Sequence, residues 1–484
     1  MAVKCVVPKT PRLQWFSTAK YSPFSVATST STSPPRTHNA VLPQPSPPSK
    51  KAPLAVLPTG TLLRSLLFTS IMSSPLLDPC LSIMKSVVNS KSPILSPSKN
   101  PVINYILRKT IYNHFCAGTN ETEVRKTVQD TKALGFKGVI LGYARESIAK
   151  TDGDSHTQFR VVKSQRVKED QAVEEWKQGN LRTLSMIGAG DFLGIKFTGA
   201  GPAAVEALSR GDPLPPSSIQ QAITEICAAT ASQASRLWID AEQQIFQPAI
   251  DAWTINLMRR FNRNGTIVVY NTIQAYLKSS TDNVQRHLRL AQNEGWTLGI
   301  KLVRGAYIAH DIRAQIHDSK AATDRNYDHI VESLLTRRFP LGDGDRDGNG
   351  EDAVSFQRPH FPDVRLFVAS HNAGSVWKAS LLYTQRMHSG LPTIPVEVGQ
   401  LQGMADEVSC ELLGEKRVGD LKDKGRCSQT VPATPGVFKC LAWGTTEECL
   451  HFLLRRAVEN KSAMERTRDT AVAMRREAWR RFGW

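Results

Sequence analysis

The chain has 484 residues, 40% of them hydrophobic and 22% charged, so it can bury a large core and has the composition of an ordinary soluble globular protein. Its eight cysteines include no CxxC pair and have no histidine partners at metal-ligand spacing, which argues against a metal site and favours reduced thiols. Residues 1–100 carry 11 Lys and Arg against one acid, so most of the net charge of +17 lies there, and the absence of a basic stripe with interleaved aromatic residues argues against nucleic-acid binding.

Residues 1–60 are rich in Pro and Ser and contain no acidic residue. Such a segment cannot bury enough apolar surface to fold, so we expect it to be disordered. A basic, Ser-rich and acid-free N-terminus is typical of an organelle transit peptide; a disordered tail without targeting function is the alternative. Residues 61–135 are expected to form a helical extension. Arg64, Pro75 and Asp78 interrupt its apolar patches, so no run of about 18 residues spans a bilayer and any membrane contact is expected to be peripheral.

From about residue 137 onward, short β-branched runs alternate with stretches of helical spacing, which indicates parallel strands joined by helices. The runs lie at 137–144, 192–200, 236–242, 266–276, 297–307, 365–372, 393–404 and 438–444. Eight repeats favour a (βα)8 barrel over residues 136–484. An open doubly wound sheet is the competing architecture, but no GxGxxG motif follows the first strand.

Two polar segments are predicted to be insertions in this barrel, at 341–354 and 413–436. The first has the regularly spaced aspartates of a calcium loop. However, Val354 stands where such a loop needs its bidentate glutamate, so we predict a solvated Gly/Asp loop without a metal. The second is equally polar and is expected to be mobile.

Polar side chains follow several of the predicted strands, where barrels of this kind carry their chemistry. These residues are Lys196, Asp240, Glu242, Gln274, Tyr276, Lys301, Arg304, His371 and Asn372. Any one buried lysine is readily explained as part of a structural ion pair. Cations that converge from several strands instead indicate an anionic or electron-rich ligand, because unpaired buried cations are costly.

The segment after the eighth run, GTTEECLHFLLRRAVEN, is predicted to be a helix, because Thr445 and Glu448 stand at capping-box spacing before an apolar stripe. Residues at positions i, i+3, i+4 and i+7 of another face project together, and they are Phe452, Arg455, Arg456 and Glu459. Two guanidinium groups facing the barrel mouth would bind a carboxylate bidentately, with Glu459 holding one of them; a solvated arginine-rich turn is the alternative.

The sequence resembles the proline dehydrogenase family in five ordered motifs, KLVRGAY, TDRNY, SHN, LQGMAD and LLRRAVEN. The resemblance covers residues from about 100 to 483 apart from the two insertions, and LPTGTLLRSLL and YNHFCAGT are similar to fungal mitochondrial members. It implies a distorted (βα)8 barrel with FAD at the strand ends and oxidation of L-proline to 1-pyrroline-5-carboxylate. It also implies a membrane quinone as electron acceptor and peripheral contact with the inner mitochondrial membrane at its matrix face.

The resemblance further implies roles for single residues. Those expected at the substrate are Lys196, Arg455 and Arg456 at its carboxylate, Asp240 beside its amine, and Leu401 against its ring. Those expected at the cofactor are Lys301, Gln274, Arg304, Gly305, Ala306, Ser370 and His371. Cys440 and Phe452 depart from the family, which has tyrosines there beside the substrate. We therefore expect weaker proline binding or acceptance of a larger imino acid, hydroxylated or six-membered.

Two other functions remain open on the sequence. One is an FAD-binding paralogue that turns proline over poorly and acts as a regulatory protein. The other is a Schiff-base aldolase that uses Lys196 or Lys301, an interpretation based on the lysines alone.

Overall fold

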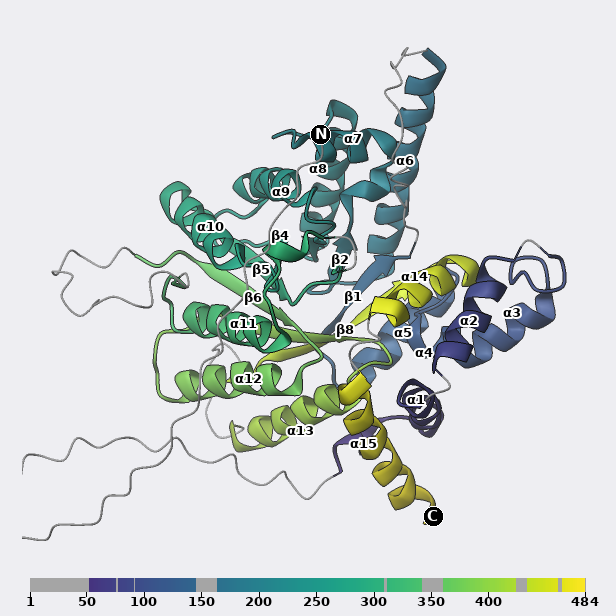
Figure 1. Cartoon of the computed structure of the whole chain (residues 1–484). Coiled ribbons are helices and arrows are strands. Elements are labelled where there is room, and N and C mark those ends of the chain that lie inside the picture. The colour runs from purple at the N-terminus through teal and green to yellow at the C-terminus, as the bar shows by residue number, and fades with distance from the viewer. Residues whose placement is uncertain are drawn as a thin grey trace, which may run out of the picture. The chain divides into compact units, whose positions relative to one another are not determined.

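The computed structural model describes residues 52–74, 77–90, 92–144, 163–308, 311–341, 360–423, 433–459 and 464–483. Over these ranges the chain forms a closed barrel of eight parallel strands that pair in chain order, with β8 closing onto β1 (Figure 1). The predicted (βα)8 barrel is therefore confirmed.

The strands coincide with the eight predicted runs. They are β1 (Gly138–Tyr143), β2 (Phe192–Ile195), β3 (Arg236–Ile239), β4 (Val269–Gln274), β5 (Leu298–Val303), β6 (Val364–Ala369), β7 (Val396–Leu401) and β8 (Gly436–Trp443). Strands of a parallel barrel are covered on both faces, so they read as nearly continuous apolar runs. Strand β4 shows this best, because all of its residues are buried.

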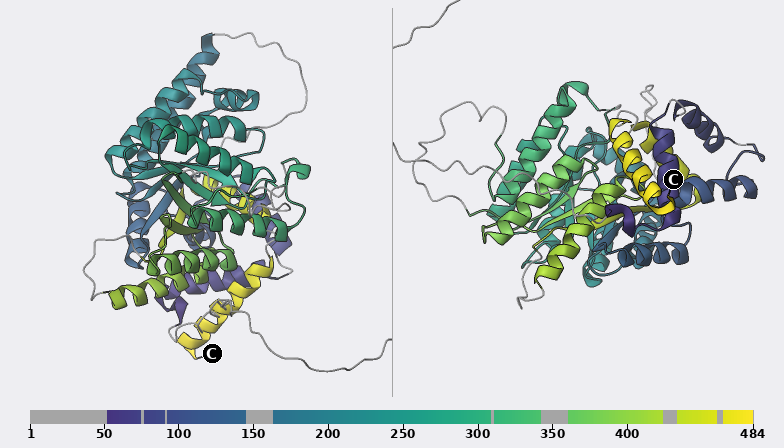
Figure 2. Two further views of the ribbon diagram at one scale, coloured as in Figure 1. Left: turned by 90° about the vertical axis from the view of Figure 1, so that its left-hand side faces the viewer. Right: turned by 90° about the horizontal axis from the view of Figure 1, so that it is seen from below.

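Helices follow the strands, and most of them cover the outside of the barrel, whereas the last, α14 (Thr446–Glu459), borders its open end (Figures 1 and 2). They are α6 (Lys163–Ser185), η3 (Phe197–Ala200), α7 (Pro202–Arg210), α8 (Ser217–Ser232), α9 (Gln247–Phe261), α10 (Ser280–Glu294), η4 (Arg313–Gln315), α11 (Lys320–Leu335), α12 (Ala373–His388), α13 (Asp406–Asp423) and α14. Helix α10 shows how they attach: Val284, Leu288 and Ala291 share one face and are buried. That face packs against β4 and β5.

Aromatic side chains fill much of the barrel interior. Rings of Trp238, Tyr270, Phe367 and Phe438 surround Phe192 with centroids 5.1–5.6 Å away. The guanidinium of Arg236 stacks on Phe192 at 3.9 Å and pairs with Glu397 at 2.6 Å. Trp238 and Phe367 also line a cavity at the carboxyl ends of the strands, so this aromatic layer forms the floor of that cavity.

A helical extension precedes the barrel. Its elements are η1 (Pro53–Val56), α1 (Thr59–Met72), α2 (Leu77–Val88), α3 (Pro101–Leu107), the π-helix η2 (Arg108–Tyr112), α4 (Asn113–Phe115) and α5 (Glu121–Ala133). Helical structure begins at Pro53, earlier than the predicted boundary at residue 61, because Leu54 and Leu62 pack on Met474 of α15 (Met464–Phe482). Figure 2 shows α15 beside α1 in the view from below.

No single described helix is long and apolar enough to cross a membrane, and α1 and α2 meet the length and hydropathy criteria only as a pair bent by 107°.

The predicted insertions have different outcomes. Nearly all of segment 341–354 lies outside the described residues, so its loop structure stays a prediction. Segment 413–436 is only partly an insertion, because α13 continues through it to Asp423 and β8 begins at Gly436. Its residues up to Asp423 therefore belong to helix α13. Residues 424–432, like the proposed transit segment up to residue 51, lie outside the described ranges.

His114 gives the fold a pH dependence. Its ring is 3% exposed and lies 5.0 Å from the Phe68 ring. Burial lowers the pKa of His114 to about 4, against an opposing effect of Asp406 and with a further lowering by Arg64 and Lys439. The His114 imidazole is therefore protonated near pH 6.5 in the unfolded chain but only near pH 4 in the folded protein. Between these values the unfolded chain binds more protons, so the free energy of unfolding falls as the pH falls.

We expect the free energy of unfolding to be about 2 kcal/mol lower at pH 5 than at pH 7 on account of His114. Urea unfolding of wild type and His114→Phe at both pH values measures the difference. His287, whose pKa burial also lowers, contributes with the same sign in both proteins. An identical pH slope in the two proteins would contradict the assignment.

Candidate active site

The carboxyl ends of the strands open into a cavity of about 360 Å³, a size typical of small-molecule and cofactor sites. Twelve of the residues predicted from the sequence line it, namely Lys196, Asp240, Gln274, Lys301, Arg304, Gly305, Ala306, Ser370, His371, Leu401, Cys440 and Phe452. They come from separate strands and from α14. Of the nine strand-end residues predicted to converge, six line this cavity, whereas Glu242, Tyr276 and Asn372 do not line it. The chemical roles of all these residues stay predictions.

Lys301 and Asp240 form an ion pair in the lining of the cavity. Lys301 Nζ donates to Asp240 Oδ1 at 2.5 Å and lies 3.9 Å from the centre of the Trp238 ring. The lysine side chain is 12% exposed and the carboxylate 27% exposed, so water screens the pair only in part. The pair places one cation and one anion where a ligand would contact both.

A buried carboxyl group supports the loop after β2. Glu242 is 5% exposed, accepts a hydrogen bond from Thr198 N at 3.1 Å, and accepts a second from the Thr198 hydroxyl. Burial raises the pKa of Glu242, against the opposing effects of Thr198 and Lys196. Gln274 Nε2 donates to the Glu242 carbonyl at 3.2 Å. Glu242 thus joins the ends of β2, β3 and β4, which carry Lys196, Asp240 and Gln274.

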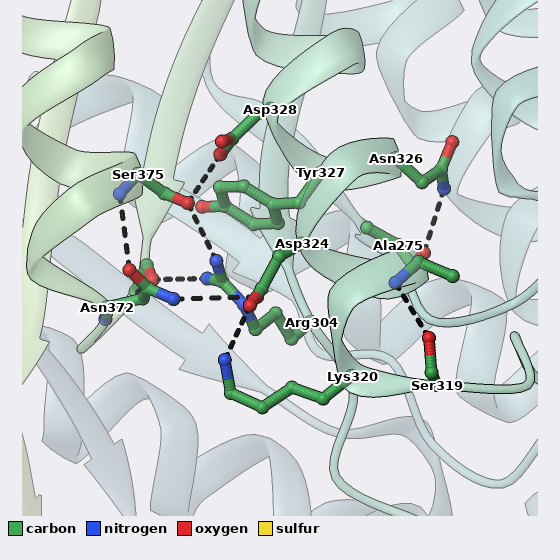
Figure 3. A network of polar contacts seen from close by, with 12 residues as sticks. Ala275, Arg304, Ser319, Lys320, Asp324, Asn326, Tyr327, Asp328, Asn372 and Ser375 are labelled. Atoms are coloured by element: carbon green, nitrogen blue, oxygen red, sulfur yellow. Dashed lines mark hydrogen bonds and ion pairs between the residues drawn. The ribbon is translucent and has the colours of Figure 1, made fainter. Parts of the chain in front are cut away.

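Arg304, just after β5, is held in one orientation by a polar network (Figure 3). Its Nε donates to Asp324 Oδ1 at 2.7 Å, and its terminal nitrogens donate to the hydroxyls of Ser370 at 2.5 Å and Ser375 at 2.7 Å. The guanidinium also lies 4.3 Å from the centre of the Tyr327 ring. Burial favours the neutral Asp324 carboxyl, but Lys320 and Arg304 outweigh it and lower the pKa of Asp324. A charged carboxylate therefore keeps Arg304 in place.

Gly305 lets the backbone after Arg304 pass closely over Tyr276. Its φ is 146°, and an added Cβ would lie 2.4 Å from Tyr276 Cδ1. Tyr276 N donates to the Arg304 carbonyl at 2.7 Å, and the Tyr276 hydroxyl bonds to Asp311. Only glycine fits this backbone conformation and this contact, so the segment of Gly305 and Ala306 can lie against a ligand through its main chain.

The apolar side of the cavity is formed by β7, β8 and α14. Leu401 N donates to His371 Nε2 at 3.1 Å, which fixes the end of β7 against the end of β6. Leu401 and Cys440 are register partners on neighbouring strands. Together with Phe452 they also border a second, small cavity of about 20 Å³. The wall next to the predicted substrate position therefore includes unfilled space beside Cys440.

The predicted helix after the eighth strand is confirmed as α14. Its capping box is also present: Glu448 N donates to Thr445 Oγ1 at 3.3 Å and Thr445 N donates to Glu448 Oε2 at 2.9 Å. Phe452 reaches the cavity. Arg455, Arg456 and Glu459 lie on the same helix, but their side chains are outside what the structure describes, so the carboxylate clamp stays a prediction.

Some lining residues were not predicted from the sequence. Trp238 is the clearest, because its ring contacts Lys301 and forms part of the floor. A signal was present: Trp238 stands two residues before Asp240 on β3, and side chains alternate along a strand, so both face the interior. Asp324 and Ser375 do not line the cavity but orient Arg304 from helices α11 and α12, and Asp324 belongs to the motif TDRNY.

Comparisons with known proteins agree with this site. The family model described as proline dehydrogenase matches residues 124–469. The chain belongs to the proline dehydrogenase family. The match runs from α5 into α15, so the family region includes the barrel, the cavity and α14.

The chain is similar to enzymes of fungi and animals. A probable mitochondrial proline dehydrogenase of Schizosaccharomyces pombe is 28% identical over 78% of this chain and 81% of its own length. A hydroxyproline dehydrogenase of Rattus norvegicus is 28% identical over 78% of this chain and 83% of its own. Human mitochondrial proline dehydrogenase 1 is 33% identical, but over 48% of this chain and 33% of that protein. The chain is thus similar both to proline dehydrogenases and to a hydroxyproline dehydrogenase, and these similarities do not distinguish between the two substrates.

Among solved structures, proline utilization A from Bdellovibrio bacteriovorus, inactivated by N-propargylglycine, superposes with a TM-score of 0.56 and 13% identity. It covers 83% of this chain, which in turn spans 41% of that longer protein. At this identity the likeness establishes the barrel fold.

Proposed function

We propose that the protein oxidises L-proline to 1-pyrroline-5-carboxylate with bound FAD and passes the electrons to a membrane quinone. The observation that carries the proposal is the convergence of Lys196, Asp240, Lys301 and Arg304 in one cavity of a proline dehydrogenase family member. The basic N-terminal segment and the mitochondrial relatives support a location at the matrix face of the inner mitochondrial membrane.

The donor set of the cavity fits FAD. A dinucleotide needs cations and main-chain contacts for its phosphates, and Arg304, Gly305 and Ala306 supply these on a fixed backbone. Ser370 and His371 lie beside them, and Gln274 and Lys301 line the same cavity. These residues would hold the cofactor, which supplies hydride acceptance when bound.

The remaining polar residues would hold the substrate. Lys196, Arg455 and Arg456 would bind the proline carboxylate, and Asp240 would lie next to the amine, where a positive charge persists on the product nitrogen. Leu401, Cys440 and Phe452 would exclude water from the ring. Fixing both ends of proline orients its δ-carbon, and orientation of this kind accounts for much of the rate of such reactions.

Anaerobic mixing with proline tests the proposal. The purified protein should show a flavin absorbance band that bleaches on addition of proline. Arg456→Met should raise the proline concentration needed for half bleaching about 30-fold, because a charge-assisted bidentate contact is lost. Arg325→Met, at an exposed position on α11, should leave it unchanged.

A flavin band that proline does not bleach would reject the dehydrogenase proposal and favour the regulatory paralogue. A protein without flavin, in which borohydride traps substrate on a lysine, would favour the aldolase.

A hydroxylated imino acid is a second candidate substrate, favoured by the small cavity beside Cys440 and by the similarity to hydroxyproline dehydrogenase. Cys440→Tyr should fill this space. We expect the ratio of kcat/KM for hydroxyproline to that for proline to fall about tenfold, since a ring there would crowd a ring substituent. Cys227→Ser, at a buried cysteine away from the cavity, serves as the control. A ratio unchanged by Cys440→Tyr would remove the basis for this candidate.

A further inference from the structure

The helical segment before the barrel exposes a row of apolar side chains. Val102 and Tyr105 on α3 are each 63% exposed and Ile106 is 50% exposed. They stand at i, i+3 and i+4 and therefore share one face of the helix. Lys109 at i+7 continues this face, with its ammonium 5.7 Å from the centre of the Tyr105 ring. We call Val102, Tyr105, Ile106 and Lys109 the α3 stripe.

The loop before α3 also exposes apolar side chains. Ile94 is 72% exposed and Leu95 44% exposed. Asn100 holds this loop to the helix, because its side-chain amide donates to the Ile94 carbonyl at 2.6 Å while its Oδ1 accepts from Val102 N at 2.9 Å. Single exposed apolar residues are normal on protein surfaces, whereas a grouped set held by hydrogen bonds marks an interaction site.

Other residues of the segment anchor it beside the active site. Asn104 on α3 contacts Thr446 at the start of α14, with 3.4 Å between Oδ1 and Oγ1. The Tyr112 hydroxyl donates to the Gly444 carbonyl at 2.7 Å, and α2 packs against α14. Helix α14 carries Phe452 into the cavity. The α3 stripe is therefore attached to the helix that borders the substrate site.

The charge around the stripe indicates which kind of partner could bind there. Residues 77–123 contain five Lys and Arg and three acidic residues, of which Glu123 pairs with Arg108 at 2.6 Å, so a small positive excess remains. An exposed apolar row with cations beside it matches an anionic lipid surface, in which side chains enter the acyl boundary and ammonium groups meet the headgroups. A second copy of this chain would bring the same positive charge to a two-fold interface, so self-association there is opposed by repulsion.

We propose that the α3 stripe docks the protein on an anionic membrane surface and so keeps α14 and the cavity mouth near the lipid. The inference rests on the proposed transfer of electrons to a membrane quinone, because docking at this place brings the reduced site close to a lipid-soluble acceptor. It identifies one surface for the membrane contact. The C-terminal helix α15, which is also basic and exposes Trp479, is the competing surface.

Co-sedimentation of the full chain with phosphatidylcholine vesicles, with and without cardiolipin, tests the docking. Wild type should bind cardiolipin vesicles, and added salt should weaken the binding. Val102→Ser/Tyr105→Ser/Ile106→Ser should lower the partition coefficient about tenfold or more. Leu214→Ser/Leu381→Ser/Leu391→Ser removes three similarly exposed apolar side chains elsewhere on the barrel and should leave it unchanged.

Proline oxidation with a soluble dye as acceptor separates this proposal from the proposed function. The α3 variant should keep the dye-coupled rate and its unfolding midpoint while losing vesicle binding. Docking through the α3 stripe is rejected if wild type does not bind cardiolipin vesicles or if the α3 variant binds them as well as wild type does. It is also rejected if Trp479→Ser alone abolishes this binding. The docking proposal is also rejected if wild type is an oligomer, the α3 variant is a monomer, and both bind vesicles equally well. A protein that binds through the stripe but leaves proline unoxidised supports docking and rejects the proposed function.

Discussion

Replacing Lys301 with alanine should lower kcat for proline oxidation about 100-fold or more. Lys301 is the cation nearest Asp240 in the cavity, at 2.5 Å, and it is only 12% exposed. Under the proposed function, Lys301 would stabilise negative charge on the cofactor, and removing one such donor typically costs about 10²–10³ in kcat. Steady-state rates with a soluble dye acceptor, normalised to bound flavin, measure this effect.

Two variants separate charge stabilisation from structural damage. Lys301→Arg keeps the cation and should recover most of the rate lost in Lys301→Ala. Lys278→Ala removes a lysine that is 46% exposed and pairs with Asp318 on the surface, so kcat should not change. If Lys301→Ala retained the wild-type rate at full flavin content, the ion pair with Asp240 would be structural only.

The barrel could be predicted from the sequence because its signal is local and repeated. A buried parallel strand such as β4 gives a nearly continuous apolar run, and eight runs in one chain restrict the architecture to very few topologies. The start of the helical extension was harder to place. Pro53 and Ser- and Pro-rich neighbours suggest an unfolded segment, and only the long-range packing of Leu54 on Met474 overrides that composition.

Part of the active site could also be predicted from the sequence. Residues such as Lys196 and Asp240 directly follow strands, so the barrel geometry alone brings them to one mouth. The network that orients Arg304 was not predictable, because Ser370 and Ser375 lie 66 and 71 residues away in sequence. Ser370 directly follows β6 and Ser375 lies in the first turn of α12, and only the fold places their hydroxyls beside a guanidinium.

The largest effect on stability is expected at a buried ion pair behind the cavity wall. Lys439 Nζ donates to Asp406 Oδ1 at 2.7 Å, and the two side chains are 7% and 6% exposed. Lys439→Met would leave the Asp406 carboxylate buried, and among the described residues the Ser65 hydroxyl at 3.4 Å would be its remaining side-chain hydrogen-bond partner. We expect a loss of about 3–5 kcal/mol in the free energy of unfolding, measured by urea denaturation followed by tryptophan fluorescence.

The double variant Lys439→Met/Asp406→Leu should recover much of this loss, because no unpaired charge remains in the interior. Lys137→Met is the matched control: that lysine is 46% exposed and pairs with Glu397, so the expected cost is below about 1 kcal/mol.

Side chains alternate along β8, so Lys439 points away from the cavity that Cys440 lines, and kcat of the folded fraction should stay near wild type. If Lys439→Met were as stable as wild type, water would reach Asp406, and the Lys439–Asp406 pair would not hold the turn after β7 against β8.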